Sequence, residues 1–290
     1  MLYGSMTALI TPFRDGNVDE PAFALLVERQ IAEGTHVLVP CGTTGESATL
    51  SHDEHRKVVA LCVDIAAGRV PVIAGAGSNA TSEAIDLMRH AKEVGADAVL
   101  SVAPYYNKPS QEGLYAHYKA LNDAVQIPIV VYNIPGRSVV DIRPETMARI
   151  ATLPNVIGVK DSTGDPSRAA WHRELISADF LNIAGDDNLA LGYAAYGAVG
   201  CISVLSNVAP GPCAALQEAL RDNDWDQARA INERLAPLAR ALFMDPNPTP
   251  TKHALSVLGL CSAEVRLPMT PPSEATKKAV EAAMAHAGLV

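Results

Sequence analysis

The alternation of short apolar runs with longer amphipathic stretches restricts the possible folds of this chain more than any other feature. Between the apolar runs, hydrophobic residues recur at three- and four-residue spacing, which predicts amphipathic helices. The predicted helices include 22–32, 54–67, 82–94, 111–124 and 144–150. The runs themselves have the length of strands and are bounded by turn residues: 6–10, 37–40, 70–74, 98–103, 127–132, 156–160, 181–184 and 199–204.

About eight strand–helix units predict a parallel sheet, because strands linked by helical crossovers run in the same direction. An open doubly wound sheet usually carries a glycine-rich nucleotide turn after its first strand, whereas Thr11-Pro12-Phe13 follows Ile10 here. We therefore predict the α/β class and a (β/α)8 TIM barrel over residues 1–222. Further helical stretches at 226–243, 251–258 and 273–287, joined by proline-rich segments, predict a helical C-terminal extension over 223–290.

Several helix ends are marked by capping residues. Ser51 ahead of Glu54 and Thr81 ahead of the next apolar stretch are typical helix starts. Gly34 and Gly95 follow helical stretches, where a residue that tolerates a left-handed backbone ends a helix. These signals predict the boundaries of the first three helices.

Composition and charge narrow the possible partners. The 290 residues are 48% hydrophobic and 19% charged, which is typical of a chain with a large buried core. The net charge of −9 argues against a nucleic-acid partner, because phosphates attract Lys and Arg patches that the sequence lacks. We therefore expect small-molecule ligands.

The cysteines and the N-terminal segment indicate the compartment. Five scattered cysteines with no Cys-x-x-Cys pair predict reduced thiols and no metal site. The segment MLYGSMTALITPF lacks the pattern of a secretion signal, and no apolar run reaches the length of about 20 residues that spans a membrane. We expect a cytoplasmic protein with no membrane partner.

Two polar side chains end successive predicted strands. Lys160 ends the run 156–160 and Tyr132 ends the run 127–132, and a barrel of this kind carries its catalytic groups at these C-terminal strand ends. Apolar surroundings favour the uncharged lysine amine, which attacks ketones, and a neighbouring phenol can transfer protons. The alternatives are a lysine that reaches solvent and a tyrosine that packs in the core.

Two loops beside these strand ends carry candidate binding groups. Gly42-Thr-Thr-Gly-Glu lacks the spacing of a P-loop, but its amides and hydroxyls can converge on a carboxylate; an ordinary tight turn is the alternative. Arg137 can grip a carboxylate with two hydrogen bonds or lie on the surface. Tyr105 and Tyr106 follow the fourth strand and are typical of interface anchors.

Longer motifs around these positions resemble the pyruvate-dependent aldolases that include dihydrodipicolinate synthase and N-acetylneuraminate lyase. The resemblance runs nearly end to end, and it implies a class I aldolase that forms a Schiff base and needs no cofactor and no metal. Seven segments carry it: Ala8-Leu-Ile-Thr-Pro-Phe, Gly42-Thr-Thr-Gly-Glu-Ser-Ala-Thr-Leu, Ala103-Pro-Tyr-Tyr-Asn-Lys-Pro, Val131-Tyr-Asn-Ile-Pro-Gly-Arg, Gly158-Val-Lys-Asp, Gly185-Asp-Asp and Pro246-Asn-Pro.

The resemblance implies a catalytic role for four residues. Lys160 would be the Schiff-base lysine for pyruvate, and Tyr132 would donate and accept protons. Thr43 and Tyr106 would complete its proton relay, with Tyr106 reaching across a dimer interface into the neighbouring site. A catalytically silent barrel that only binds a metabolite would need a broken relay, and every relay position is filled here.

The resemblance also implies how substrates are held. Thr44 would hold the pyruvate carboxylate through its amide and hydroxyl, with Ile202 and Gly185 near the same ligand. Arg137 would recognise the carboxylate of the second substrate. The arginine, together with Thr43, favours the synthase branch, which condenses pyruvate with L-aspartate 4-semialdehyde to 4-hydroxy-tetrahydrodipicolinate in diaminopimelate and lysine biosynthesis.

An alternative within the same family is an aldolase that cleaves a 2-keto sugar acid, such as a sialic acid or a 2-keto-3-deoxy acid. Sialic acid lyases typically carry a serine at the position of Thr43 and do not keep Arg137. One local departure from many synthases is Ser138-Val139, where those enzymes have Thr-Gly. This departure concerns the loop rather than the chemistry.

Regulation and assembly are further implications of the resemblance. Feedback-inhibited members bind L-lysine at the dimer interface, and the family favours a homotetramer. Glu83 can pair with an ammonium group, while Asn79 and Tyr105 can bond a carboxylate; alternatively, His52 and His55 are merely exposed at a helix start. The positions that match the lysine site are Ser47, Ala48, His52, His55, Asn79, Glu83 and Tyr105.

Overall fold

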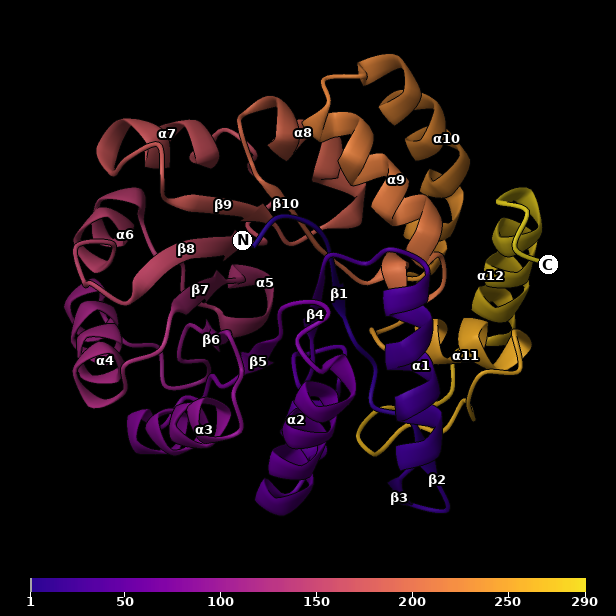
Figure 1. The fold of residues 1–290 in the computed structure, drawn as a ribbon, viewed down its shortest axis with the longest axis horizontal. Helices are drawn as coiled ribbons and strands as arrows, with labels where there is room; N and C mark the ends of the chain where they lie inside the picture. The colour runs from indigo at the N-terminus through magenta and orange to yellow at the C-terminus, as the bar shows by residue number, and fades with distance from the viewer. Residues whose placement is uncertain (1) are drawn as a thin grey trace.

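Eight parallel strands form the centre of the molecule in a computed structural model that describes residues 2–290 (Figure 1). In hydrogen-bonded order they run β4-β1-β10-β9-β8-β7-β6-β5. Within residues 2–290, none of the helices combines the length and the apolar character that a membrane span requires. The strands are β1 (Gly4–Ala8), β4 (Val37–Val39), β5 (Ile73–Gly75), β6 (Ala98–Val102), β7 (Ile129–Asn133), β8 (Val156–Asp161), β9 (Leu181–Ala184) and β10 (Gly200–Ser203).

The two outer strands of this order, β4 and β5, meet and close the sheet. A parallel bridge joins Leu38 to Val72, and the Leu38 amide donates to the Pro71 carbonyl at 3.0 Å. Just beyond the C-terminal end of β4, the Gly75 amide of β5 donates to the Pro40 carbonyl at 2.9 Å. The predicted (β/α)8 barrel is confirmed.

Helices follow the strands around the outside of the barrel (Figure 1). The sequence did not indicate the β2–β3 hairpin (Phe13–Arg14, Asn17–Val18), because each of its strands has only two residues. The helices of the barrel are α1 (Glu20–Ala32), α2 (His52–Ala66), α3 (Thr81–Glu93), α4 (Gln111–Ala124), α5 (Pro135–Ser138), α6 (Pro144–Ile150), α7 (Arg168–Leu175), α8 (Ala190–Ala195) and α9 (Pro210–Arg221).

Three predicted helix boundaries are confirmed and one is wrong. Ser51 caps α2 in a reciprocal capping box with Glu54, and Gly34 and Gly95 adopt φ of 88° and 90° just after α1 and α3. Thr81 does not cap α3: the cap is Ala80, and the Thr81 hydroxyl instead bonds His117 Nδ1 at 2.9 Å. The Thr81 hydroxyl thus bonds a residue of α4 and does not cap the backbone of its own helix.

The C-terminal extension consists of α10 (Trp225–Ala241), α11 (Thr249–Val257) and α12 (Glu274–His286), with α12 at the outer edge of the molecule (Figure 1). Its buried apolar residues form a cluster with Leu205, Val208 and Ala209, which precede α9, and with Cys213 of α9. Since α9 ends at Arg221 and α10 begins at Trp225, we propose the boundary between barrel and extension at 222/223.

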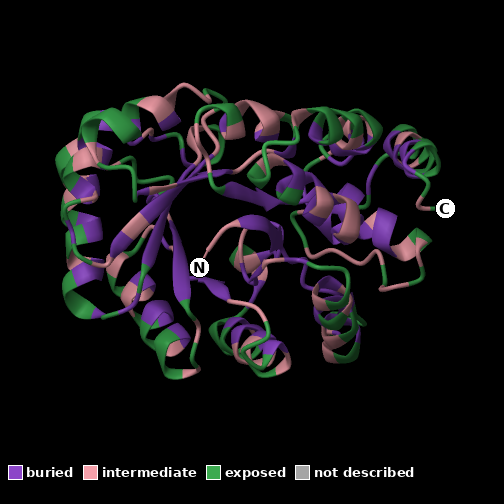
Figure 2. Cartoon of the chain, turned by 45° about the horizontal axis from the view of Figure 1, so that its top comes forward, coloured by how far each residue is buried: buried purple, intermediate pink, exposed green. Residues whose placement is uncertain are grey.

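Buried residues lie along the strands and on the helix faces turned toward them (Figure 2). Their apolar side chains form two layers. One layer lies inside the barrel and includes Met6, Tyr132 and Ile202, while the other lies between strands and helices. Strands buried on both faces explain why the apolar runs were nearly continuous in the sequence. Polar side chains that remain at the C-terminal strand ends therefore stand out.

Candidate active site

Lys160 and Tyr132 lie side by side at the C-terminal ends of adjacent strands. The register of β7 and β8 pairs Tyr132 directly with Lys160. The Nζ of Lys160 lies 4.2 Å from the centre of the Tyr132 ring, and the two residues are only 7% and 6% exposed. A buried primary amine beside a phenol is suited to form an imine with a ketone and to move the protons that this reaction requires.

Gly185 provides room for the Lys160 side chain. A Cβ at Gly185 would lie 3.1 Å from Lys160 Cε and would collide with the hydroxyl of Ser162. The absence of a side chain therefore lets the segment after β9 lie close to Ser162 and to the lysine stem. This explains why a glycine follows this strand.

A cavity of about 620 Å³ opens above Lys160 at this end of the barrel. It brings together six of the residues predicted for catalysis and substrate binding: Lys160, Tyr132, Thr43, Thr44, Arg137 and Gly185. Phe243, Met244 and Asn247 line it from the segment between α10 and α11, so the C-terminal extension forms part of the wall. Residues of the barrel that sequence reasoning missed include Ala8, Ser162, Asp186 and Val204.

The Gly-Thr-Thr-Gly loop is held in place by buried hydrogen bonds. Asn247 Nδ2 donates to Thr44 Oγ1 at 3.0 Å, and the Thr11 hydroxyl donates to the Gly45 carbonyl at 2.7 Å. Thr44 itself is 2% exposed. Asn247 is a site residue that sequence reasoning missed, although it lies in Pro246-Asn-Pro, one of the segments that carry the family resemblance.

Two predicted residues do not line this cavity. Ile202 is 1% exposed and packs inside the barrel, whereas Val204, two residues later on the same side of the chain, faces the cavity. Tyr106 is 87% exposed with a φ of 71° and points away from the core of its own chain. In addition, within residues 2–290 no hydrogen bond joins Thr43 directly to Tyr132.

Arg137 lies on the short helix α5 at the mouth of the cavity. Its side chain is exposed, and it forms no ion pair within the described part of the chain. Ser138, next to it, is buried and donates to the Ile134 carbonyl at 2.9 Å. Val139 adopts a φ of 64°, a region that favours glycine. Many of the resembled synthases have a glycine at this position, so the valine strains the backbone here.

Comparison with known proteins decides the family. The model of the dihydrodipicolinate synthetase family matches residues 1–287. The chain belongs to this family. It is similar to a protein of Parvibaculum lavamentivorans named 4-hydroxy-tetrahydrodipicolinate synthase, with 61% identity over 290 residues and full coverage of both chains.

Solved structures of the dihydrodipicolinate synthetase family have the same fold. A chloride-inhibited dihydrodipicolinate synthase from Acinetobacter baumannii, complexed with pyruvate, matches with a TM-score of 0.98 and 42% identity over all of both chains. An enzyme from Cyanidioschyzon merolae with lysine bound matches with a TM-score of 0.96 and 36% identity over 99% of each chain. The predicted resemblance is confirmed.

A second cavity of about 620 Å³ adjoins the cavity above Lys160. Both cavities are lined by Thr43, Ile134, Arg137 and Asn247. Asn79 does not line it; its carbonyl accepts a hydrogen bond from Asn107 Nδ2 at 2.9 Å. Six of the seven residues predicted for lysine binding do line it: Ser47, Ala48, His52, His55, Glu83 and Tyr105.

Glu83 already has two partners in this second cavity. Its Oε1 lies 2.7 Å from His52 Nε2, and its other oxygen accepts a hydrogen bond from the Ser78 hydroxyl. The Ser78 bond, followed by His52, holds the pKa of Glu83 below its usual value against the effect of burial. Burial lowers the pKa of His55 to about 4, so this imidazole is neutral at neutral pH.

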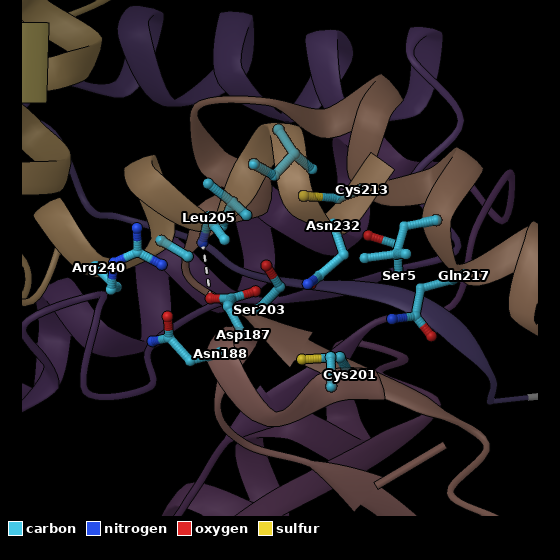
Figure 3. A pocket seen from close by; sticks show the side chains of 15 residues that line it. Ser5, Asp187, Asn188, Cys201, Ser203, Leu205, Cys213, Gln217, Asn232 and Arg240 are labelled. Atoms are coloured by element: carbon cyan, nitrogen blue, oxygen red, sulfur yellow. Dashed lines mark hydrogen bonds between the residues drawn. The ribbon is translucent and has the colours of Figure 1, made fainter. Parts of the chain in front are cut away.

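A third cavity, of about 320 Å³, lies between the outside of the barrel and α9 and α10 (Figure 3). Asp187 faces it and accepts hydrogen bonds from the backbone amides of Val204 and Leu205 at 2.9 and 3.0 Å. None of the predicted site residues lines this cavity.

Within residues 2–290, no group of three or more His, Cys, Asp or Glu side chains is arranged to hold a metal ion.

Proposed function

We propose that this chain condenses pyruvate with L-aspartate 4-semialdehyde to 4-hydroxy-tetrahydrodipicolinate, a step of diaminopimelate and lysine biosynthesis. The observation that supports this most strongly is the buried Lys160 amine, which lies beside Tyr132 below a cavity that also contains Thr43 and Thr44. Membership of the dihydrodipicolinate synthetase family supports the choice of substrates.

The reaction begins at the Lys160 amine. In its neutral form the nitrogen attacks the C2 carbonyl of pyruvate, and the carbinolamine then loses water to give an imine. Tyr132, whose ring is 4.2 Å from Nζ, is the group placed to protonate the departing hydroxyl and later to remove a proton from the pyruvate methyl group. The resulting enamine attacks the aldehyde of the second substrate.

Ring closure releases the lysine. The amino group of the bound semialdehyde attacks the imine carbon, and the Lys160 nitrogen leaves as an amine once it is protonated. Thr43 relays protons to and from Tyr132, together with Tyr106 from a second copy of the chain. The exposure of Tyr106, at 87%, supports this arrangement because the side chain is available to a neighbouring subunit.

The two carboxylates are assigned to different groups. Thr44 binds the carboxylate of pyruvate through its amide and hydroxyl, with Gly185 in the wall of the cavity and Ile202 packed inside the barrel without lining it. Arg137 binds the carboxylate of the semialdehyde, because its guanidinium is exposed at the cavity mouth and has no acidic partner in the described chain. A homotetramer built from dimers that share Tyr106 is the proposed assembly.

L-Lysine is the proposed inhibitor, and the second cavity is its proposed site. The cavity contains Glu83 for an ammonium group and adjoins the active site through Thr43 and Arg137. The lysine-bound relative from Cyanidioschyzon merolae supports this assignment. Millimolar lysine is expected to inhibit the wild type and to have a weaker effect on Glu83→Gln; an enzyme that ignores lysine at this concentration would remove the proposal.

Product analysis tests the proposed function directly. The enzyme is incubated with pyruvate and L-aspartate 4-semialdehyde, and separately with sialic acid and 2-keto-3-deoxy acids. We expect condensation with the semialdehyde and no cleavage of the sugar acids. Cleavage of a sugar acid without condensation would identify the sister activity instead.

A further inference from the structure

A buried ion pair connects the C-terminal extension to the loop that carries Thr43 and Thr44. Lys252 of α11 is 0% exposed, and its Nζ lies 2.5 Å from Oε1 of Glu46, whose side chain is 3% exposed. Glu46 ends the Gly-Thr-Thr-Gly-Glu segment. Two charges this deeply buried are stable only together, because each alone would lose its hydration without compensation.

Each partner of the pair is held by further contacts. Lys252 Nζ donates to the Glu264 carbonyl at 2.9 Å and lies 4.0 Å above the Phe13 ring. The Arg266 amide donates to Oε2 of Glu46 at 3.0 Å, and the Arg266 guanidinium lies 4.2 Å from the Phe13 ring. The carboxylate of Glu46 is thus fixed from both of its oxygens by residues of the extension.

The backbone at Glu46 requires this support. Glu46 adopts a φ of 52°, which is unfavourable for a residue other than glycine, and its amide donates to the Thr43 carbonyl at 3.0 Å. The side chain that Lys252 holds therefore fixes the turn that begins at Thr43. A shift of Glu46 would move the Thr43 carbonyl and, with it, the two threonines of the loop.

We propose that Glu46 and Lys252 are positioning residues that hold the Gly42–Glu46 loop in the geometry required for binding pyruvate. This inference rests on the proposed function, since that function assigns pyruvate binding to Thr44 of this loop. Neither residue lines the cavity above Lys160, so both act through the loop rather than on the substrate. The C-terminal extension contributes to pyruvate binding by way of this pair.

The double variant Glu46→Gln/Lys252→Met separates positioning from stability. Gln keeps an oxygen for the Arg266 amide, and Met fills the space above Phe13 with an apolar chain of similar length, so neither charge is left buried alone. We expect thermal stability close to that of the wild type. The matched control is Glu28→Gln/Arg69→Met, which removes a bidentate pair with distances of 2.7 and 2.9 Å outside the loop.

Two measurements are made on both variants. Hydrogen exchange of a peptide that covers residues 41–50 reports the order of the loop, and steady-state kinetics report KM for each substrate. For the double variant we expect faster exchange in this peptide and a pyruvate KM raised about 10-fold or more, with KM for the semialdehyde changed by less than about twofold. The control is expected to match the wild type in both.

Wild-type exchange in residues 41–50, or an unchanged pyruvate KM, would overturn the inference. The failure of the proposed function is a separate result, because it is seen in the wild type: that enzyme would not condense pyruvate with the semialdehyde. In that event faster loop exchange in the double variant would still support the role of the pair in ordering the loop, and wild-type exchange would still refute it.

Discussion

Lys160 and Lys252 are both buried lysines, and their surroundings differ in one decisive respect. Lys252, which is 0% exposed, has Glu46 at 2.5 Å and a backbone carbonyl at 2.9 Å. Lys160, which is 7% exposed, faces a cavity and a phenol ring, and no acidic side chain in the described chain forms an ion pair with it. The presence of an acidic partner, rather than the depth of burial, distinguishes a lysine with a structural role from a candidate nucleophile.

The largest difference between the two lysines is expected in activity. Lys160→Met removes the nucleophile, so condensation should fall by about 10⁴-fold or more, because the remaining groups cannot form the imine. Its thermal stability should equal or exceed that of the wild type, since no ion pair is broken. Steady-state rates and calorimetry test this; a variant that keeps a tenth of the activity would exclude Lys160 as the nucleophile.

For the single variant Lys252→Met, the main effect is expected in stability rather than in activity. The substitution leaves the Glu46 carboxylate buried without its cation, which should reduce the free energy of unfolding by about 3–5 kcal/mol. Denaturant unfolding measures this loss, and adding Glu46→Gln should recover most of it. A single variant as stable as the wild type would mean that the pair does not hold the structure together.

Acid should reduce the free energy of unfolding through His55, which lines the second cavity and not the cavity above Lys160. His55 lines the same cavity as Glu46, and burial lowers its pKa from 6.5 to about 4. The unfolded chain therefore binds a proton first, and the stability that neutral His55 contributes is lost as pH falls from above 6.5 toward 4, by at most about 3 kcal/mol. Unfolding free energies at pH 7 and 4.5 measure this loss.

The matching control is His55→Gln, whose side chain does not titrate. The pH dependence of its stability should be shallower than that of the wild type. The same slope in both proteins would show that His55 does not contribute to acid sensitivity.

The smallest of the expected effects is the loss of kcat on substitution of Tyr132, the neighbour of Lys160. Tyr132→Phe removes the phenolic proton and keeps the ring, so kcat should fall by about 100-fold while the protein stays folded. Adduct formation with pyruvate should slow but still reach completion, because the Lys160 amine is intact. A Phe variant with the wild-type kcat would refute the proposed role of Tyr132 in proton transfer.

Much of this arrangement could be predicted from the sequence, because it depends on local patterns. Strands buried on both faces give apolar runs, and a polar residue at the end of such a run, such as Lys160 or Tyr132, stands out. The order of the units then predicts a closed barrel. Both residues were expected at adjacent strand ends, where the register of β7 and β8 places them.

What the sequence did not predict depends on contacts between distant segments. Asn247 and Thr44 are separated by 203 positions, and the partner of Lys252 lies in a loop near the other end of the chain. Thr81 has the composition of a cap, but its hydroxyl bonds His117 on α4 instead. No local pattern records such partners, because each is created by the packing of the completed barrel.

Covalent trapping tests the role of Lys160 most directly. The enzyme is mixed with pyruvate and reduced with borohydride, and the modified residue is located by mass spectrometry of peptides, with Lys252→Met and Lys160→Met as parallel samples. We expect one reduced pyruvate per chain, on Lys160, in the wild type and in Lys252→Met, and none in Lys160→Met. An unmodified wild-type chain, or a modified lysine other than Lys160, would contradict this role.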